Sequence, residues 1–375
     1  MTMRVLFPFV GDSVGGSHLA TLALINHLDL AKFEPVVVLD RDGPLARKFD
    51  AAGLDHTVVP LGRLAGETSG IADVFFALFD AAPKAARFLR ENEIDLVHTN
   101  DLRCHLTWGP IARLSGRRWV WHLHQLLSGS VLWMAPTALA DRILAVSPQA
   151  ADSAPALARG RTTVLPNGFD FGTLADRQAA KAGLASEIGI EAGRPIVAYV
   201  GNMTRQKRPA VFAAAAVRVA AALAEPPCFV LVGDDRGGER AEIERSFAQA
   251  GLSAHVRFLG YRERVPELLS GVDVLAAPGV GDSFGRTLVE ALSVGTPVVA
   301  SRSGGHSFIV ADGETGVLVE PDDPDALARG LLKVLDDEEL ARGLGKSGER
   351  DVRSRFDAAA IAKDVMAVYD SLFVT

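Results

Sequence analysis

Two carboxylates, Asp282 and Glu290, stand eight positions apart in the stretch GDSFGRTLVEALSVGTPVV, residues 281–299. The apolar run VDVLAAP (272–278) predicts a buried strand before them. FGRTLVEALSVG predicts a helix that Gly295 ends as a C′ glycine. The pattern therefore places Asp282 in a strand–helix loop and Glu290 inside the helix.

The start of this helix has the features of an anion site. Gly285, Arg286 and Thr287 would present backbone N–H groups that have no acceptor within the helix, and such groups bind phosphate. Glu290 shares the face of Arg286 and Thr287 one turn further in, where a carboxylate suits the paired hydroxyls of a ribose. We interpret Asp282 as a ligand for sugar hydroxyls. A Glu290–Arg286 ion pair, with Asp282 as the helix cap, explains the spacing equally well.

Cations follow the strand predicted for PIVAYVG (195–201). Arg205, Lys207 and Arg208 lie in VGNMTRQKRP, between that strand and a helix. In doubly wound sheets ligands bind outside the carboxyl ends of the strands, and charge-assisted hydrogen bonds to phosphate are strong. These residues therefore predict a diphosphate site, although a solvated basic turn has the same composition.

A glycine-rich loop follows the first predicted strand. In GDSVGGSHLATLALINHL, Gly15 and Gly16 allow a ligand to approach the backbone closely, and Ser17 is predicted to cap the next helix. The loop is not the GxGxxG fingerprint, and it is equally typical of a tight strand–helix turn.

Histidines gather at the ends of two predicted strands. His98 lies in DLVHT, and His122 and His124 lie on one face at the end of WVWHLH. Cys104 and His105 are near in sequence, but no third ligand stands at a diagnostic spacing, so we predict no metal site.

Two more segments of the first half could face an acceptor. HTNDLRCH places Asn100, Asp101 and Arg103 after a predicted strand. The apolar loop QLLSGSVLWMAP (125–136) is expected to be buried in the first domain, with contact to a lipid acceptor or a membrane surface as the alternative.

The elements that must position these groups alternate along the whole chain. Short apolar runs separated by helical stretches are typical of doubly wound α/β domains with parallel sheets. We predict two Rossmann-like domains, residues 1–168 and 169–354, facing each other across a cleft. The predicted strands are 4–9, 35–39, 95–99, 119–123, 142–147, 195–201, 228–233, 256–260, 272–278 and 296–301.

Composition narrows the function classes. The 375 residues carry a net charge of −7, which does not fit a nucleic-acid binder. The two cysteines, Cys104 and Cys228, have no CxxC spacing, which argues against a disulfide framework and a zinc site. The opening MTMRVLFPFV predicts a buried strand, and PAVFAAAAVRVAAALAE (209–225) predicts a packed helix, not a membrane span. We expect a cytoplasmic protein, with contact to the inner face of the membrane as a further option.

Taken together, the motifs resemble a known family. DSFGRTLVEALSVGTPVVASRSGG is similar to the signature of the retaining glycosyltransferases of family 4, within the glycosyl transferases of group 1. Its hallmark is two acidic residues separated by seven, with Phe-Gly after the first. VGNMTRQK, LPNGFD, VRFLGYRERVPELLSGVDVLAAP and DGETGVLVEPDDPDALA resemble the other blocks of the family in its order. The resemblance implies the GT-B fold, with residues 355–375 as a C-terminal helix that crosses back to the first domain.

The resemblance also implies roles for matching positions. Glu290 would bind the ribose, Asp282 the donor sugar and Lys207 the leaving diphosphate. His124 would face the donor from the first domain. The implied catalytic residues are His124, Lys207 and Asp282. The implied donor-binding residues are Arg205, Ser283, Phe284, Gly285, Arg286, Thr287 and Glu290. The N-terminal loop and acceptor side comprise Gly15, Gly16, Ser17, Asn100 and Asp101.

At three positions the chain departs from the family pattern. Asp282 stands where the family usually has Glu, and we expect the shorter side chain to alter the sugar preference. Asn202 replaces an Arg, and we hypothesise that Arg205 supplies the missing charge. Phe308 stands near the position of a Glu, which puts that contact with the donor in question.

The implied function is transfer of a sugar from a nucleotide-sugar, most commonly a UDP-sugar, to an acceptor hydroxyl with retention of configuration. Lys207, Arg205 and the helix N-terminus would stabilise the leaving diphosphate, with no metal or other cofactor. The acceptor would be a glycan, a lipid-linked sugar or a small molecule, in glycan, polysaccharide or glycolipid biosynthesis. A nucleotide-sugar epimerase on the same fold and a non-catalytic nucleotide-sugar-binding protein are the alternatives.

Overall fold

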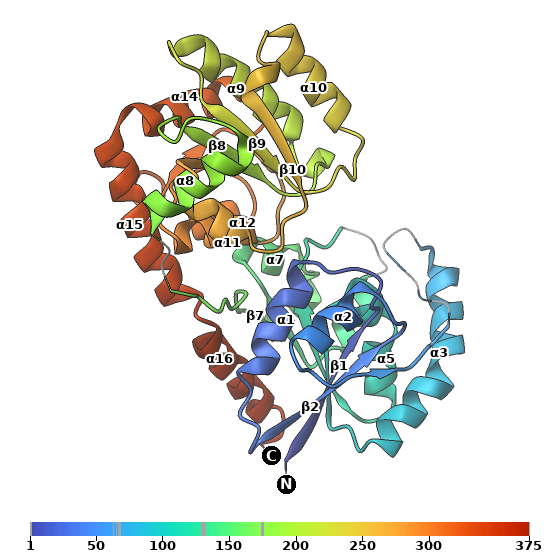
Figure 1. Cartoon of the computed structure of the whole chain (residues 1–375). Helices are drawn as coiled ribbons and strands as arrows, with labels where there is room; N and C mark the ends of the chain where they lie inside the picture. The colour runs from blue at the N-terminus through green and yellow to red at the C-terminus, as the bar shows by residue number, and fades with distance from the viewer. Residues whose placement is uncertain are drawn as a thin grey trace. The chain divides into compact units, whose positions relative to one another are not determined.

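The computed structural model divides the chain into two compact units. It describes residues 2–374 except 63, 65, 67, 68, 129–132, 174 and 175. Unit 1 comprises Met1–Asp170 and Phe356–Thr375, and unit 2 comprises Phe171–Arg355. The chain therefore leaves unit 1 and returns to it with its last helix, drawn in red in Figure 1.

Unit 1 is built on a seven-stranded parallel sheet in the order β3-β2-β1-β4-β5-β6-β7. The central strands are near-continuous apolar runs whose side chains are buried, as strands covered on both faces require. The strands are β1 (Met3–Phe9), β2 (Phe33–Leu39), β3 (Thr57–Val58), β4 (Leu96–Thr99), β5 (Arg118–Leu123), β6 (Arg142–Ala145) and β7 (Thr162–Val164).

Helices cover both faces of this sheet. They are α1 (Gly16–Asn26), α2 (Pro44–Ala51), α3 (Ile71–Glu91), α4 (Leu102–Leu106), α5 (Trp108–Leu114), α6 (Met134–Leu139), α7 (Pro148–Ser153) and α16 (Ala358–Ser371). Alternate side chains of β1 point to opposite faces, so Val5 and Phe7 pack with α1, α2 and α16, whereas Leu6 packs with α3 and α5. In Figure 1, α16 lies beside α1.

Unit 2 has a six-stranded parallel sheet in the order β10-β9-β8-β11-β12-β13. The strands are β8 (Ile196–Val200), β9 (Cys228–Val232), β10 (Val256–Gly260), β11 (Val274–Ala277), β12 (Val298–Ser301) and β13 (Val317–Val319). The helices are α8 (Arg177–Ile188), α9 (Pro209–Ala222), α10 (Arg240–Gln249), α11 (Val265–Ser270), α12 (Arg286–Ser293), α13 (His306–Ile309), α14 (Pro324–Asp336) and α15 (Glu338–Arg355). Because β8, β11 and β12 are parallel neighbours, the loops that follow them meet at one edge of the sheet.

The predicted α/β class with two parallel Rossmann-like sheets is confirmed. Each of the ten predicted runs contains a strand, and the structure adds β3, β7 and β13. These three strands have two or three residues each, too few to show a pattern in the sequence.

Residues 209–222 of the apolar segment 209–225 form α9, which packs into the core of unit 2 through side chains that include Phe212 and Val219. No helix in the described part of the chain is long and apolar enough to cross a membrane.

Candidate functional site

In unit 2, the carboxylate motif lies where β11 leads into α12. The helix begins at Arg286 after Gly285, whose φ of 105° lies in the left-handed region. A Cβ at Gly285 would lie 2.9 Å from Cδ2 of His306, so both the backbone and the space require glycine. The predicted helix end is confirmed, because Gly295 follows the C-cap with a φ of 72°. The N-cap is Gly285 and not Asp282, so the interpretation of Asp282 as a helix cap is wrong.

Asp282 is nearly buried, with 8% of its surface exposed, and two donors converge on it. Lys207 Nζ donates to Oδ2 at 2.6 Å, and His306 Nε2 lies 3.2 Å from the same oxygen. Burial alone would raise the pKa of Asp282, but the hydrogen bond from His306 and the charge of Lys207 outweigh burial and lower the pKa to about 2. Asp282 is therefore an anion at neutral pH, held from the loop after β8 and from α13.

The three cationic side chains after β8, Arg205, Lys207 and Arg208, have different surroundings. Lys207 reaches Asp282, and the Arg208 guanidinium pairs with Asp322 at 2.6 Å. Arg205 is exposed on the 3-10 helix η3 (Arg205–Lys207). Of the three, Lys207 is the one that the structure brings to the carboxylate motif, and a diphosphate contact from Arg205 stays a prediction.

Glu290 and Arg286 lie one turn apart on α12. Nη2 of Arg286 is 3.5 Å from Oε1 of Glu290, so the ion pair that the spacing allowed is present. Burial lowers the pKa of Arg286, and the Glu290 carboxylate opposes that shift. Thr287 also belongs to the first turn of α12, at the end of a helix where backbone N–H groups point outward. In the preceding loop, Phe284 is buried and Ser283 is half-buried.

Asn202 and Phe308, the two other departures from the family pattern, both contact neighbouring segments of unit 2. Asn202 Oδ1 accepts from the backbone N–H of Asp234 at 3.3 Å. The Phe308 ring lies 6.4 Å from that of Phe284, and the Arg355 guanidinium lies 5.1 Å from its centroid. Both side chains connect the loops at this edge of the sheet.

In unit 1, the glycine loop begins α1. Gly15 is the N-cap, and its backbone N–H donates to Nδ1 of His18 at 2.9 Å. Helix α1 starts at Gly16, so the prediction that Ser17 caps it is wrong. Ser17 lies in the first turn, and its carbonyl accepts from Thr21 Oγ1 at 2.8 Å. The His18 ring makes the capping contact because it reaches back to the Gly15 N–H.

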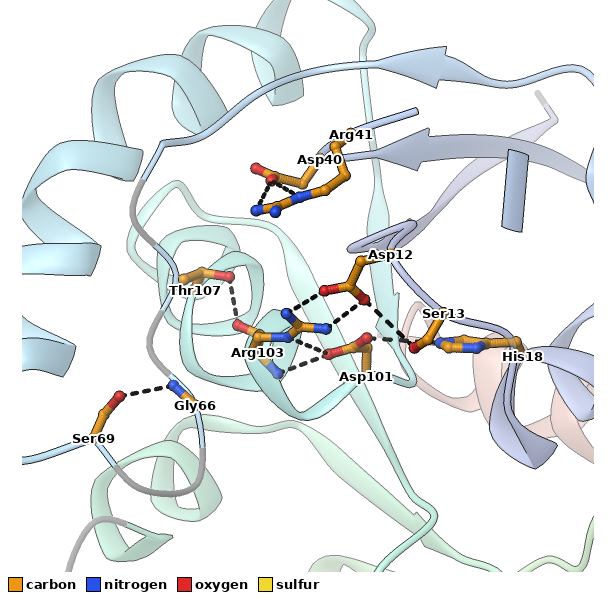
Figure 2. A network of polar contacts seen from close by, with 10 residues as sticks. All are labelled: Asp12, Ser13, His18, Asp40, Arg41, Gly66, Ser69, Asp101, Arg103 and Thr107. Carbon is orange, nitrogen blue, oxygen red and sulfur yellow. Dashed lines mark hydrogen bonds and ion pairs between the residues drawn. The ribbon is translucent and has the colours of Figure 1, made fainter. Parts of the chain in front are cut away.

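Charged groups connect this loop to the end of β4 (Figure 2). The Arg103 guanidinium donates to both carboxylate oxygens of Asp12, at 2.7 and 2.8 Å. Asp101 caps α4 by accepting from the Arg103 N–H at 2.9 Å, and His18 Nε2 faces its other oxygen at 3.6 Å. Burial alone would raise the pKa of Asp101, but the contacts with His18 and Arg103 lower it. The predicted acceptor-side residue Asp101 is thereby fixed in an ionised network.

Histidines of β4 and β5 and of the segments that follow these strands form a cluster at the same edge. His98 Nε2 lies 3.2 Å from His122 Nδ1, and the ring centroids of His122 and His124 are 4.2 Å apart, which confirms their shared face. Burial lowers the pKa of His98, that of His105 to about 3 and that of His122 to about 4. These three rings are therefore neutral at pH 7. Asn100 is buried beside them and donates to the His98 carbonyl at 3.3 Å, and the role of His124 toward a donor stays a prediction.

Among the residues that the structure describes, no three His, Cys, Asp or Glu side chains are placed to hold a metal ion. Of the apolar loop 125–136, residues 129–132 lie outside the described residues, so its contact with a lipid acceptor or a membrane stays a prediction.

Residues of these sites that were not predicted from the sequence include His18, Asp12 and His306. His306 follows two glycines after the strand run 296–301, and Asp12 lies in the loop after the first strand. The signal for both was available, because polar residues that follow a buried parallel strand lie at its ligand-binding edge.

Two family models match the chain. The model for Glycosyltransferase Family 4 matches residues 14–172, and the model for Glycosyl transferases group 1 matches residues 184–351. The alpha-maltose-1-phosphate synthase of Mycolicibacterium smegmatis is 33% identical over 269 residues, which make up 66% of this chain and 69% of that protein. The chain belongs to the glycosyltransferases of group 1 and family 4. This glycosyltransferase is accordingly an enzyme of sugar transfer.

Another relative of the glycosyltransferase matches over a shorter stretch. The D-inositol 3-phosphate glycosyltransferase of Corynebacterium urealyticum is 32% identical over 191 residues, 49% of this chain and 45% of that protein, so the chain spans less than half of that relative. The solved structure of Anabaena Alr3699/HepE in complex with UDP and glucose has a TM-score of 0.82 at 23% identity and covers 98% of this chain and 100% of that chain. That likeness shows the GT-B fold.

Proposed function

We propose that this glycosyltransferase moves a sugar from a UDP-sugar to an acceptor hydroxyl, with retention of the anomeric configuration and without a metal ion. The observation that carries the proposal is the ion pair of the buried Asp282 with the partly exposed Lys207, beside the start of the helix α12 that bears Glu290. A cation beside a helix N-terminus suits a diphosphate, and two carboxylates suit the hydroxyls on either side of it. UDP is favoured because the Anabaena protein of the same fold was solved with UDP and glucose.

The diphosphate would lie against the first N–H groups of α12, with Lys207 Nζ as its counter-ion. Negative charge develops on the leaving diphosphate as the bond to the sugar breaks. Lys207, Arg205 and the helix N-terminus would offset that charge, which is the task a metal ion has in other transferases. Glu290 would accept from the ribose hydroxyls, because its 3.5 Å contact with Arg286 is long and easily exchanged.

Retention would follow from attack on the face of the sugar that UDP leaves. The acceptor hydroxyl bonds to the anomeric carbon, the bond to the diphosphate breaks, and a diphosphate oxygen takes the hydroxyl proton. In unit 1, the loop at Gly15 and Gly16 and the strand end at Asn100 and Asp101 would bind the acceptor. Glycans, lipid-linked sugars and small polyols, including phosphorylated ones, are the acceptors to test, since one relative is named for D-inositol 3-phosphate.

Melting temperatures measured with UDP-, GDP-, ADP- and dTDP-sugars, each with and without a chelator, test the donor site. A UDP-sugar at 100-fold its Kd should raise the melting temperature by about 5 °C, with or without chelator. Glu290→Ala should lose this shift. Glu349→Ala is the matched control and should keep it, because Glu349, like Glu290, pairs with an arginine four positions away in its own helix, Arg353, at 3.4 Å.

Turnover completes the test. UDP release should depend on the acceptor, and the product should keep the anomeric configuration of the donor by NMR. An epimerase would instead change the sugar without an acceptor. Absence of a shift with every nucleotide-sugar, or a shift abolished by the chelator, would contradict the proposal.

A further inference from the structure

His306 is a buried residue at the proposed donor site to which none of the roles above is assigned. It begins α13, is 2% exposed, and its ring lies beside Gly285 at the start of α12. Nε2 lies 3.2 Å from Oδ2 of Asp282, and Nδ1 lies 3.3 Å from the Ser301 carbonyl. Because an ionised carboxylate can only accept hydrogen bonds, the Nε2–H group donates to Asp282.

Lys207 and His306 share one oxygen of Asp282. Lys207 Nζ is 2.6 Å from Oδ2, whereas Oδ1 has a contact of 3.5 Å with Nε2 of Gln206, at the limit of a hydrogen bond. When Lys207 turns toward a diphosphate, His306 is the close donor that stays on Asp282. A buried carboxylate left without a partner is strongly destabilised, so the donor that stays decides how readily Lys207 can leave.

We propose that His306 is a positioning residue for donor binding. By holding Asp282, it allows Lys207 to turn from that carboxylate to the diphosphate of the nucleotide-sugar. The inference rests on the proposed function, because it assigns the diphosphate to Lys207.

Calorimetric titration with UDP alone tests this role on the wild type, His306→Ala, Asp282→Asn and the double variant. In His306→Ala, Lys207 is the close partner that remains for Asp282, so the affinity for UDP should fall about tenfold. Adding Asp282→Asn removes the charge that holds Lys207, so the double variant should recover to within about threefold of Asp282→Asn alone. A double variant as weak as His306→Ala, or a His306→Ala variant of unchanged affinity, would overturn the inference.

A second pair of variants separates holding Asp282 from filling space. The amide of His306→Gln would lie near the position of Nε2 and could still donate to Asp282. The amide of His306→Asn lies where Nδ1 lies and reaches only the Ser301 carbonyl. We expect kcat/KM of the Gln variant to stay within about fivefold of the wild type and that of the Asn variant to fall roughly 50-fold. If kcat/KM falls equally in the two variants, or falls more in the Gln variant, the His306 ring only fills space, and the inference is overturned.

The wild type distinguishes this inference from the function on which it rests. A wild type that binds no UDP contradicts the donor site itself. A wild type that binds UDP, together with variants of unaltered affinity, contradicts the role of His306 alone.

Discussion

The two units hold different chemistry at equivalent edges of their sheets. At the end of β11 in unit 2, the buried Asp282 is ionised and paired with Lys207. At the ends of β4 and β5 in unit 1, a cluster of buried histidines is neutral, and the ionised Asp101 and Asp12 beside it contact His18 and Arg103. A buried group at a strand end keeps its charge where a counter-charge lies within hydrogen-bond reach and loses it where burial dominates. Unit 2 therefore holds a charge pair suited to a diphosphate, whereas the core of unit 1 is sensitive to acid.

The largest effect is expected from removing the cation of unit 2. Lys207→Met should lower kcat by roughly 100- to 1,000-fold, because it deletes a charge aimed at the leaving diphosphate. Lys181→Met is the matched control, since Lys181 Nζ lies 2.7 Å from Asp273 in the same unit. It should change kcat by less than about twofold. Acceptor-dependent release of UDP measures kcat of both variants. If the two variants lose the same activity, the Asp282–Lys207 pair has no special role in the reaction.

Acidification is expected to weaken unit 1 before unit 2. An unfolded histidine takes up a proton below about pH 6.5, whereas His105 and His122, with pKa values of about 3 and 4, stay neutral in the folded state. The free energy of unfolding therefore does not depend on these two rings above pH 6.5. Below that pH it falls, by about 2 kcal/mol for each ring at pH 5, because the unfolded state takes up protons that the folded state does not. The lowered pKa of Asp282 acts in a more acidic range. The stability that it contributes to unit 2 is present above about pH 4 and is lost as the pH falls toward 2.

Hydrogen exchange at pH 7 and pH 5, corrected for the intrinsic rate, measures this difference. Protection of β4 and β5 should fall more than protection of β11 and α12. His122→Gln should remove part of the loss in unit 1, because His98 and His105, whose pKa values burial also lowers, remain. His255→Gln in unit 2 is the control. A loss of the same size in both units would contradict the comparison.

A smaller effect is expected from the charged network of unit 1. Arg103→Gln should leave the affinity for UDP unchanged and raise the KM of the acceptor about tenfold, because it releases Asp12 and removes the charge that lies 3.8 Å from Asp101. Arg87→Gln removes an exposed pair with Glu91 at 2.8 Å and should change neither quantity. If Arg103→Gln weakens UDP binding instead, the network of unit 1 does not serve the acceptor.

The smallest effect compares two helix starts. Ser17→Ala should change the free energy of unfolding by less than about 0.5 kcal/mol, because Gly15 and His18 cap α1. Asp323→Ala should cost about 1 kcal/mol, because Asp323 Oδ1 accepts from the N–H groups of Asp325 and Ala326 at the start of α14. Urea titration of both variants measures these two changes in the free energy of unfolding. A larger loss from Ser17→Ala would restore Ser17 as the cap.

Both sheets could be predicted from the sequence because their central strands are long apolar runs, and parallel topology places successive strand ends at one edge. That rule, with the spacing of the carboxylates and the resemblance to the family, singled out Lys207 and Asp282, which lie 75 positions apart in sequence and 2.6 Å apart in the structure. The contact of His306 with Asp282 could not be predicted, because the direction of its ring depends on packing beside Gly285. The cap at Ser17 was predicted from a local preference, and a longer-reaching neighbour, His18, takes that role.

The central claim is that the Asp282–Lys207 pair marks the diphosphate site of a UDP-sugar donor. A crystal structure of the chain with UDP tests it most directly. We predict a diphosphate oxygen about 3 Å from Lys207 Nζ, the first N–H groups of α12 on the same diphosphate, and the ribose hydroxyls on Glu290. UDP bound away from α12, with Lys207 still directed only at Asp282, would contradict the claim.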